Sequence, residues 1–574
     1  MKRRAEKRQL SQQRFRMRGS LLTFVFALGS VVLVGQSAYL QVIDSEKLVM
    51  EGEKRHIRER VISSHRGSIT DRNGEPLAIS SPVDSVWANP SELLPKTEEL
   101  PRLARILDRD HVQLLKVLNR NINRDFVWLL RHARPDQVAA ISELGLPGIN
   151  VLREYRRFFP ATEVASHVIG LTDIDDNGQE GLEYAHNHEL AGAPGSKLVL
   201  MDGVGEDFRD IRSIRAVRHG QDLVTSIDLR IQHFAYRELK RARELHDAQS
   251  GSMVILDIRT GEVLAMVNQP GYNPNKRSQY TAERARNRAV TDIHDPGSSI
   301  KPITLAAALE HGVVEPDSMI DTGNGSLEVG VKTITDPNPL GTIDLKTLLA
   351  KSSNVATTHV GLLMEREDFW DSLSRFGFGS LTGSGLPGES RGLLTHYSDW
   401  RQISQATISY GYGISVTRLQ LARAYAALAN DGVLMPVSLL KVDQPPEGTR
   451  AVSPEIARHV LSLMEGVVES GTGSRAAIPG YRVAGKTGTA WMYSGDGKYD
   501  DQRHRAIFAG VVPASNPRLA AVVVIDEPRR SKLHGGDVAA PVFSAVMREA
   551  LRTLAIPPDA RPTLMAGIAQ GDAQ

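Results

Sequence analysis

The sequence predicts an α/β (α+β) protein in which a large domain follows a mixed domain and a single apolar N-terminal helix. Three observations carry this prediction: the length of 574 residues, an uncharged apolar run near the N-terminus, and strand and helix patterns that alternate after residue 222. A chain of this length exceeds one ordinary domain, for which roughly 100–200 residues is typical. The hydrophobic content of 41% is enough for a packed core.

The N-terminal segment predicts a membrane anchor. Basic residues crowd positions 1–18, and no charged residue lies between Gly19 and Val42. About twenty such residues span a hydrocarbon core roughly 30 Å thick, and a basic flank favours the cytoplasmic side. We expect a cytoplasmic tail over 1–18, a single-pass transmembrane helix over 19–43, and a periplasmic remainder beyond the inner membrane. A cleaved secretory signal is disfavoured, because the run is long and its cleavage site poor.

Composition excludes several classes of function. The formal net charge is only +2, so the chain as a whole carries no polyanion-binding signal. The basic N-terminal cluster is better explained as a solvated tail than as a nucleic-acid arm, because an apolar run follows it directly. Without cysteine there are no disulfides, no thiolate metal sites and no thiol catalysis. This composition is compatible with an oxidising compartment.

Residues 44–222 are expected to form a mixed domain without a catalytic pattern of its own. The charged stretch 44–62 suits either a helix or an extended chain, and Asp71–Gly74 predicts a hairpin turn between two short strands. Apolar residues recur at helical spacings between Leu100 and Leu144, which predicts helices there. The stretch 151–217 is rich in glycine and charge.

Residues 223–556 are expected to form the large domain. Strands are predicted at 224–228, 253–257, 263–267, 506–512 and 519–525, and helices at about 230–245 and 541–554. The tail 557–574 is rich in Pro, Ala, Gly and Gln, a composition typical of disorder.

The first of three short motifs is Ser298-Ser299-Ile300-Lys301. A Pro-Gly turn precedes it and strong helix formers follow it, so Ser298 and Lys301 should share one face at a helix start. A serine hydroxyl is a weak nucleophile until a base takes its proton, and lysine serves as that base only when its pKa falls. Burial, the helix N-terminus and a second cation, Lys486, would each lower the pKa of Lys301. Alone, the motif is better explained by a capping serine and an exposed lysine.

The second motif is Ser352-Ser353-Asn354, which follows a helical pattern over 345–351. Ser352 is expected to relay a proton to a leaving group, and Asn354 to orient Lys301 and a substrate amide. In isolation, a helix-to-loop cap is the better explanation of this tripeptide.

The third motif, Lys486-Thr487-Gly488-Thr489, lies in a predicted strand. Gly488 lets another backbone come close, and an exposed edge there could accept a peptide as an added strand. Lys486, Thr487 and Thr489 are expected to bind a terminal carboxylate, and the N–H groups of Ser298 and Thr489 to form an oxyanion hole. Alone, the tetrapeptide fits a β-turn equally well.

In this order and at this wide spacing, the three motifs together indicate serine acyl transfer in a large enzyme domain. A second Ser-x-x-Lys match, Ser438–Lys441, shows no helix start and is expected to be inert. Neither the calcium-like turn 173–178 nor the pair His186 and His188 has a full ligand set, and Gly323-x-Gly325 lacks a dinucleotide-binding context. No metal and no cofactor are expected.

With these motifs, the chain resembles the class B penicillin-binding proteins, and most of all their division-specific transpeptidases, over nearly its whole length. The residues that carry the resemblance, besides the three motifs, are Arg66–Ile69, Asp71–Gly74, Gly181-x-Glu183, Arg286–Asp292 and Ser409–Thr417. The resemblance implies a transpeptidase domain like that of serine β-lactamases over 223–556, with a central antiparallel sheet flanked by helices. It also implies an elongated pedestal domain over 44–222.

The resemblance further implies the reaction and the partners. Ser298 would attack a peptidoglycan stem peptide at its D-Ala-D-Ala bond, release D-Ala and pass the acyl group to an amine of a neighbouring stem. A β-lactam would acylate Ser298 covalently. The inner membrane, a separate glycan polymerase and divisome membrane proteins are the implied partners, and nucleic acid is not.

Three alternatives and two departures from the family pattern stay open. A β-lactamase is disfavoured because it needs a positioned water and a base to hydrolyse its acyl-enzyme, and it usually has no anchor or pedestal. A division scaffold with a dead site is disfavoured by the intact motifs, and the elongation-specific transpeptidase is the nearest competitor. Residues 532–536 and Ala490-Trp491 depart from the division family, which affects the expected inhibitor profile and the assignment as main enzyme or paralogue.

Overall fold

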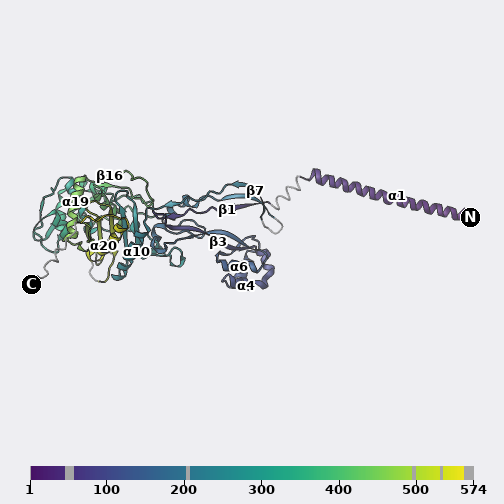
Figure 1. Ribbon diagram of the computed structural model, residues 1–574, viewed down its shortest axis with the longest axis horizontal. Coiled ribbons are helices and arrows are strands. Elements are labelled where there is room, and N and C mark those ends of the chain that lie inside the picture. The colour runs from purple at the N-terminus through teal and green to yellow at the C-terminus, as the bar shows by residue number, and fades with distance from the viewer. Residues whose placement is uncertain (1, 46–56, 202–206, 494–498, 531–533, 561–574) are drawn as a thin grey trace, which may run out of the picture. The chain divides into compact units, whose positions relative to one another are not determined.

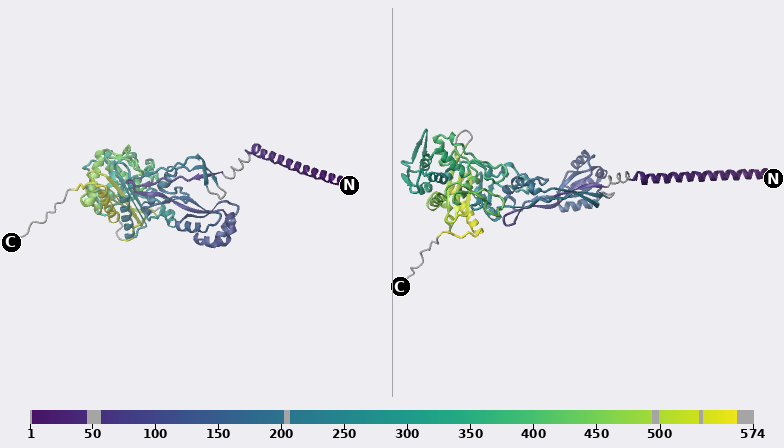
Figure 2. Two further views of the ribbon diagram at one scale, coloured as in Figure 1. Left: turned by 45° about the vertical axis from the view of Figure 1, so that its right-hand side comes forward. Right: turned by 90° about the horizontal axis from the view of Figure 1, so that it is seen from above.

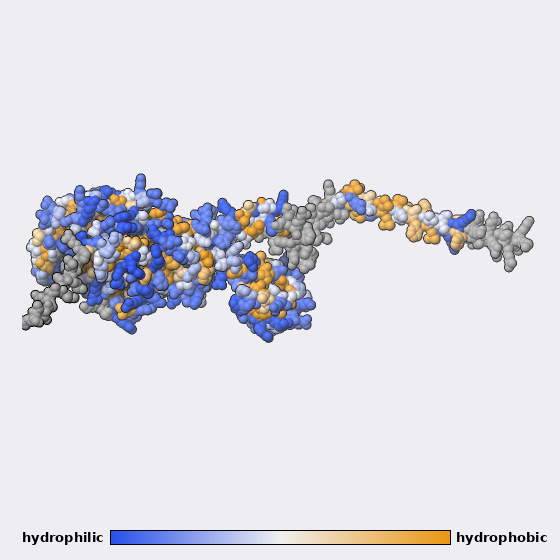
Figure 3. Space-filling model, viewed as in Figure 1, coloured by the Kyte–Doolittle hydropathy of each residue, from blue (hydrophilic) through white to orange (hydrophobic). Residues whose placement is uncertain are grey.

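The N-terminal apolar run forms a continuous helix, α1 (Lys2–Ala38), which ends in the π-helical turn η1 (Tyr39–Ile43). The computed structural model describes residues 2–45, 57–201, 207–493, 499–530 and 534–560. Within them, Phe15–Ile43 is long and apolar enough to cross a membrane, by length and composition alone. Its apolar side chains are exposed and form the orange surface of α1 in Figure 3. The predicted disordered tail lies outside the described residues from 561 onward.

The chain divides into two compact units, of which the first comprises Met1–Ser64 and Ala193–His219. Besides α1 it holds an antiparallel sheet of three strands in the order β1 (Ile57–Ile62), β6 (Gly195–Met201), β7 (Asp207–Arg215) (Figure 1). The segment before residue 63, for which helix and extended chain were both open, is therefore extended over 57–62.

The second unit, His65–Gly192 with Gly220–Gln574, begins with the predicted hairpin. Asp71–Gly74 turns the chain between β2 (Ile69–Thr70) and the long strand β3 (Pro76–Ala88), with which β4 (Val127–Ala133) and β5 (Ile149–Phe158) pair. β8 (Leu223–Val224) pairs with β2 and contains only the first residue of the predicted strand 224–228.

The helical prediction for 100–144 is confirmed at three helices, but one part of this segment forms a strand instead. The helices of this segment, after the short α3 (Pro90–Leu93), are α4 (Leu100–Ile106), α5 (His111–Arg120) and α6 (Pro135–Glu143). Residues 127–133 instead form β4, where Trp128 lies opposite Trp87 of β3. Aromatic and β-branched side chains favour a pleated surface, and the partner strand lies about forty positions earlier, beyond the reach of a local pattern.

A five-stranded antiparallel sheet forms the centre of the large domain. Its order is β10 (Val263–Gln269), β9 (Ser250–Asp257), β19 (Leu519–Asp526), β18 (Tyr499–Val512), β17 (Ala484–Tyr493). The strands predicted at 253–257, 263–267, 506–512 and 519–525 are all present, and the predicted central sheet is confirmed. β17 is an edge strand, so one row of its backbone groups has no strand partner.

Helices cover both faces of this sheet, because its strands alternate apolar residues between two cores. Met253, Ile255 and Val523 pack with α10 (Leu229–Leu245) and α20 (Gly535–Thr553), whereas Val254 and Val522 pack with α13 (Lys301–Glu310), α18 (Arg418–Ala429) and α19 (Pro454–Glu469). Figure 1 labels α10, α19 and α20, and both views of Figure 2 show the green and yellow segments packed in one body.

Two helix predictions can be compared with these bounds. The helix expected from about residue 230 is α10 and starts at Leu229, after Asp228 caps its N-terminus. α20 begins at Gly535, six residues before the predicted start, and Pro541 lies inside it. A side chain at Gly535 would meet the Ile507 carbonyl oxygen at 2.2 Å, so glycine here serves close packing against the sheet, a use that its sequence context does not reveal.

Shorter elements complete the second unit. The helices are α7 (Ser166–Ile169), α8 (Gly181–Ala185), α9 (Asn187–Ala191), α11 (Ala282–Ala285), α12 (Arg288–Thr291), α14 (Leu345–Lys351), α15 (Asn354–Leu363), α16 (Arg366–Arg375) and α17 (Gln402–Ser409). The strands are β11 (Met319–Asp321), β12 (Ser326–Val329), β13 (Lys332–Thr335), β14 (Thr342–Asp344), β15 (Val433–Leu434) and β16 (Thr449–Arg450).

Candidate active site

The first motif lies at a helix start, as predicted. Gly297–Ile300 forms the 3-10 turn η5, and α13 continues it from Lys301, whose backbone N–H donates to the Ser298 carbonyl oxygen. Pro302 occupies the first turn of α13, where its missing N–H is tolerated. Ser298 is half-buried and Lys301 is fully buried. The hydroxyl therefore stays reachable while the amine is kept from water.

The buried Lys301 amine is surrounded by the second motif. Its Nζ donates to the Ser352 carbonyl oxygen at 2.6 Å, to Asn354 Oδ1 at 2.8 Å and to Ser352 Oγ at 3.3 Å. Burial holds the pKa of Lys301 well below its usual value, and the positive charge of Lys486 lowers it further. These are two of the causes that the sequence suggested.

The second motif combines the two explanations that its sequence left open. Ser352 ends α14 in the left-handed region, at φ 60°, and this turn aims its carbonyl and hydroxyl at Lys301. Ser353 points elsewhere and caps α15, with its hydroxyl accepting from the Ala356 N–H. The middle residue is thus structural, whereas Ser352 and Asn354 contact the lysine.

Asp336 supports this motif and was missed by sequence reasoning. It follows β13 and accepts from the Ser353 hydroxyl at 2.5 Å, the Asn354 N–H at 2.5 Å and the Val355 N–H at 3.2 Å. Its charge therefore sits at the N-terminus of α15, where an anion is favoured. A single aspartate in a loop carries no local signal, so only the folded chain reveals this contact.

The third motif forms the middle of the edge strand β17 and brings the second lysine to the same place. Lys486 Nζ donates to Ser352 Oγ at 2.9 Å and to the Thr487 carbonyl oxygen at 3.1 Å. Burial lowers the pKa of Lys486 to about 7. Thr487 shares a hydrogen bond of 2.6 Å with Thr472, a second residue that sequence reasoning missed.

The open edge of β17 faces the nucleophile turn. The Trp491 N–H donates to the Tyr412 hydroxyl at 3.4 Å rather than to a strand, and backbone groups of alternate residues point the same way. Those of Thr487 and Thr489 therefore face this edge as well. A side chain at Gly488 would meet the Pro296 carbonyl oxygen at 3.0 Å, so glycine is what allows the strand and the turn to approach.

The loop before Ser298 is held by the block 409–417. The Gly297 N–H donates to the Gly411 carbonyl oxygen at 3.1 Å, and the backbones of His294 and Val416 exchange two hydrogen bonds. Gly411 has φ +97°, and a side chain there would lie 2.1 Å from the Gly297 carbonyl oxygen. The family-like block 409–417 thus holds the backbone that presents Ser298.

The pedestal motifs meet in a buried charge cluster. Glu183 is fully buried and accepts from Arg66 Nε at 2.7 Å and from Arg157 Nε at 2.6 Å. Asp71 accepts from the Asn73 and Glu75 N–H groups, which closes the predicted hairpin turn. The two segments therefore have structural roles in the second unit.

The remaining sequence matches lie away from these contacts. The Ser438 hydroxyl donates to the Leu440 carbonyl oxygen, and Lys441 donates to the Arg72 carbonyl oxygen, so this pair starts no helix. In the turn 173–178, Asp173 accepts the N–H groups of Asp175 and Asn177.

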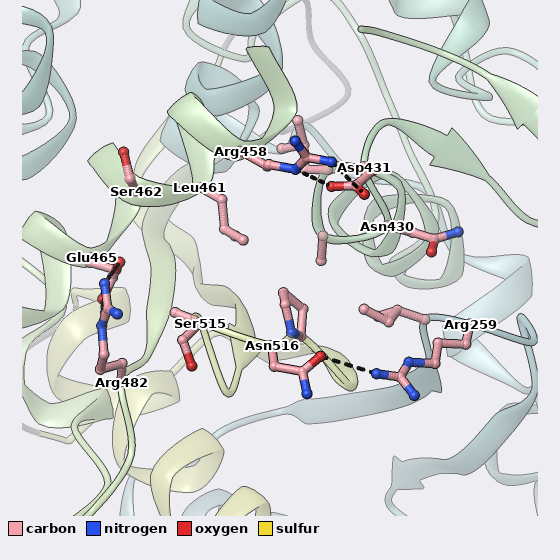
Figure 4. A pocket seen from close by; sticks show the side chains of 15 residues that line it. Arg259, Asn430, Asp431, Arg458, Leu461, Ser462, Glu465, Arg482, Ser515 and Asn516 are labelled. Carbon is pink, nitrogen blue, oxygen red and sulfur yellow. Dashed lines mark hydrogen bonds and ion pairs between the residues drawn. The ribbon is translucent and has the colours of Figure 1, made fainter. Parts of the chain in front are cut away.

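A polar cavity of about 490 Å³ lies elsewhere in the large domain and contains no residue of the three motifs. Figure 4 shows its arginines already engaged: Arg458 with Asp431, Arg482 with Glu465, and Arg259 with Asn516. The chemistry indicated by the motifs therefore belongs to the edge of β17 and not to this cavity.

Comparison with known proteins identifies the family. Residues 251–548 match the penicillin-binding protein transpeptidase domain family, and residues 61–225 match the penicillin-binding protein dimerisation domain family. The peptidoglycan D,D-transpeptidase FtsI of Escherichia coli K12 is 42% identical over 552 residues, which cover 95% of this chain and 93% of that protein. The probable peptidoglycan D,D-transpeptidase PbpC of Pseudomonas aeruginosa is 40% identical over 551 residues, 96% and 97% of the two chains.

A solved structure extends the likeness to three dimensions. Penicillin-binding protein 3 of Mycobacterium tuberculosis, complexed with aztreonam, superposes with a TM-score of 0.69 at 28% identity, over 87% of this chain and 98% of that one. The match thus includes the pedestal as well as the transpeptidase domain. This chain belongs to the penicillin-binding transpeptidases, a family of serine enzymes.

Proposed function

We propose that this protein is a peptidoglycan D,D-transpeptidase that cross-links stem peptides through an acyl-enzyme on Ser298. One observation carries the proposal: Lys301 and Lys486, from segments almost two hundred positions apart, meet at the Ser352 hydroxyl. Two buried lysine amines around one hydroxyl serve no packing purpose, and their charged forms are costly to bury, so their presence points to chemistry.

The hydrogen bonds of Lys301 suit a general base. A neutral amine has two N–H groups and one lone pair, and the Ser352 carbonyl and Asn354 Oδ1 are close enough to accept both N–H groups. The lone pair is then left for the proton of Ser298. Because burial and Lys486 lower the pKa of Lys301, its neutral form is reached more easily than that of an exposed lysine.

The edge of β17 suits the substrate. A stem peptide ending in D-Ala-D-Ala adds to this edge as a strand, with its terminal carboxylate at Lys486, Thr487 and Thr489. The N–H groups of Ser298 and Thr489 stabilise the oxyanion that forms when Ser298 attacks the penultimate carbonyl carbon. The Ser352 hydroxyl passes the proton to the departing D-Ala nitrogen, and an amine of a neighbouring stem then takes the acyl group.

The proposal is tested by identifying the residue that penicillin modifies and by measuring how long the adduct lasts. Mass spectrometry of the penicillin-treated full-length protein should place the adduct on Ser298, and Ser298→Ala should abolish labelling by a fluorescent penicillin without unfolding the protein. Ser438→Ala, the matched control in the second Ser-x-x-Lys sequence, should label normally. Labelling retained in Ser298→Ala would refute the proposal, and rapid release of the adduct would favour a β-lactamase.

The similarity to known proteins supports a proposal for the cellular role. Because FtsI of Escherichia coli is similar over 95% of this chain, we assign the protein to septal wall synthesis, with a glycan polymerase and divisome membrane proteins as partners. Depletion should then give filamentous cells, whereas rounded cells would indicate the elongation-specific function.

The membrane placement and the domain limits are part of the same proposal. Residues 19–43 anchor the protein in the inner membrane, with 1–18 in the cytoplasm and the pedestal (44–222) and transpeptidase domain (223–556) in the periplasm. A reporter enzyme active only in the periplasm, fused after residue 560, should be active. Release of the protein from membranes by alkaline carbonate would contradict the anchor.

A further inference from the structure

We infer that the Tyr499 hydroxyl is a positioning group for acylation, because its hydrogen bond to Asp295 fixes how the two halves of the oxyanion hole face each other. The inference rests on the proposed function and deepens it. Neither residue belongs to the three motifs, and neither is proposed to touch the reacting atoms.

The two halves of the oxyanion hole come from separate elements. One N–H belongs to Ser298 in the turn η5, and the other to Thr489 in the strand β17. Where these backbones approach, both contribute glycine: side chains at Gly297 and Gly488 would lie 3.2 Å from the Thr489 carbonyl oxygen and 3.0 Å from the Pro296 carbonyl oxygen. These van der Waals contacts let the turn η5 and the strand β17 lie close together. Because such contacts are not directional, they do not by themselves fix the orientation of the turn relative to the strand.

A directional contact joins the same two elements. Tyr499 is the first residue of β18, opposite Tyr493 of β17, and its hydroxyl donates to Asp295 Oδ2 at 2.7 Å. Asp295 lies three residues before Ser298. This hydrogen bond therefore ties the described part of the β17–β18 hairpin to the loop that presents the nucleophile, and we call it the hairpin latch.

Both ends of the hairpin latch are themselves held. The Ser415 hydroxyl donates to Asp295 Oδ1 at 3.4 Å. The Tyr499 ring packs edge-on against Tyr412, with 5.3 Å between ring centres, and Tyr412 accepts the N–H of Trp491. Since the neighbour of Tyr412, Gly411, accepts the Gly297 N–H, the contacts form a closed circuit around the site. Because these contacts are connected, a displacement of the β17–β18 hairpin should also displace the turn that carries Ser298.

The hydroxyl can be removed without disturbing the core. Tyr499 is 40% exposed, so Tyr499→Phe leaves no buried cavity and should cost little stability. The loss should appear in the chemical step, because small misplacements of catalytic groups are costly in rate. We expect the first-order acylation rate constant to fall about 10-fold, less than the roughly 10²–10³ for loss of a whole oxyanion donor.

The experiment uses full-length protein in detergent micelles and follows the penicillin adduct on Ser298 by mass spectrometry over time. Varying the penicillin concentration separates the acylation rate constant from the non-covalent dissociation constant, which should change by less than about twofold. The acylation rate constant is calculated only for the fraction of protein that is labelled at the end of the reaction. Partial unfolding of a variant therefore cannot be mistaken for slower acylation. Tyr481→Phe is the control, because that hydroxyl also donates a hydrogen bond, in its case to the Ile556 backbone carbonyl oxygen, away from the site.

A double-mutant cycle completes the test. Asp295→Ala should slow acylation as Tyr499→Phe does, the double variant should be no slower than the worse single one, and Asp295→Asn, which keeps an acceptor oxygen, should lose less. Unchanged acylation in Tyr499→Phe, or additive losses in the cycle, would overturn the hairpin latch alone. If wild-type Ser298 formed no adduct at all, the proposed function would be refuted, and the role of the hairpin latch would be refuted with it.

Discussion

Lys301 and Lys486 are both withdrawn from water, and both place an ammonium group near the Ser352 hydroxyl. Burial disfavours the charged form of each, and two like charges at one hydroxyl disfavour it again in Lys301. The two lysines therefore suit different roles. Lys301 loses its proton more readily and suits a general base, whereas Lys486 stays protonated to higher pH and suits a carboxylate ligand.

This difference predicts a bell-shaped pH dependence of acylation by penicillin. The second-order rate constant should rise with pH as Lys301 becomes neutral, and fall again as Lys486, with a pKa of about 7 in the free protein, loses the charge that holds the carboxylate. Stopped-flow acylation across pH 5–9 measures both limbs.

A carboxylate-free acylating ester is the control for that profile. Its rate should keep the rising limb, which belongs to the base, and lose the falling limb, which belongs to carboxylate binding. Identical profiles for penicillin and the ester would show that Lys486 does not act through the carboxylate.

At this scale, the sequence predicts the candidate residues that lie in motifs and gives no signal for those that do not. Ser298, Lys301, Ser352, Asn354 and the Lys-Thr-Gly-Thr strand are predicted because residue type, order and spacing recur together. Asp336 and Thr472 are not, since each is a common polar residue whose meaning comes only from the partner that folding brings to it.

Among the elements, the edge strand and the nucleophile turn depend on glycines that permit close approach. Gly411 is the sharpest case, because a side chain there would lie 2.1 Å from the Gly297 carbonyl oxygen. Gly413 shares a positive φ of +85°, but a side chain there would find its nearest neighbour at 3.6 Å. A side chain at Gly413 would therefore meet backbone strain alone, whereas one at Gly411 would meet both backbone strain and a steric clash.

Alanine at each of these two glycines tests that distinction. Gly413→Ala should cost about 1–3 kcal/mol from the left-handed backbone alone. Gly411→Ala should cost at least about 2 kcal/mol more and slow acylation at least about 10-fold, because the turn carrying Ser298 must move. Urea unfolding and penicillin acylation measure the two effects, and equal behaviour of the two variants would contradict a steric role for Gly411.

The elements that sequence patterns predicted correctly are those whose pattern is local. The strands of the central sheet appear as runs of Val, Ile and Ala, and α10 has a capping aspartate and a helical period. Residues 127–133 were assigned to a helix, and the start of α20 was placed too late, because β3 and the surface of the sheet decide these segments from outside.

Across the whole second unit, the buried cluster of Arg66, Arg157 and Glu183 connects segments more than a hundred residues apart. One carboxylate faces two guanidinium groups, all nearly without solvent contact. Breaking such a buried arrangement by removing one partner is far more costly than breaking an exposed pair. The cluster should therefore hold this unit together more than any surface ion pair does.

The substitution Glu183→Gln should lower the free energy of unfolding by about 3–5 kcal/mol, because two buried guanidinium groups lose their counter-charge. Glu154→Gln is the matched control, since its pair with Arg131 is partly exposed, and should cost about 1 kcal/mol or less. Thermal or urea unfolding of the two variants decides the comparison. A similar loss in both would show that the cluster carries no special share of the stability.

The sequence by itself determined the apolar helix, the strand and helix composition of the large domain, the three motifs and hence the class of chemistry. These depend on residue type and short-range period, which a linear chain already contains. Tertiary structure alone decided that two lysines meet at one hydroxyl, that Asp336 braces Asn354, and that Tyr499 reaches Asp295. Each of those contacts joins positions separated along the chain, and their proximity arises only when burial of apolar surface brings the segments together.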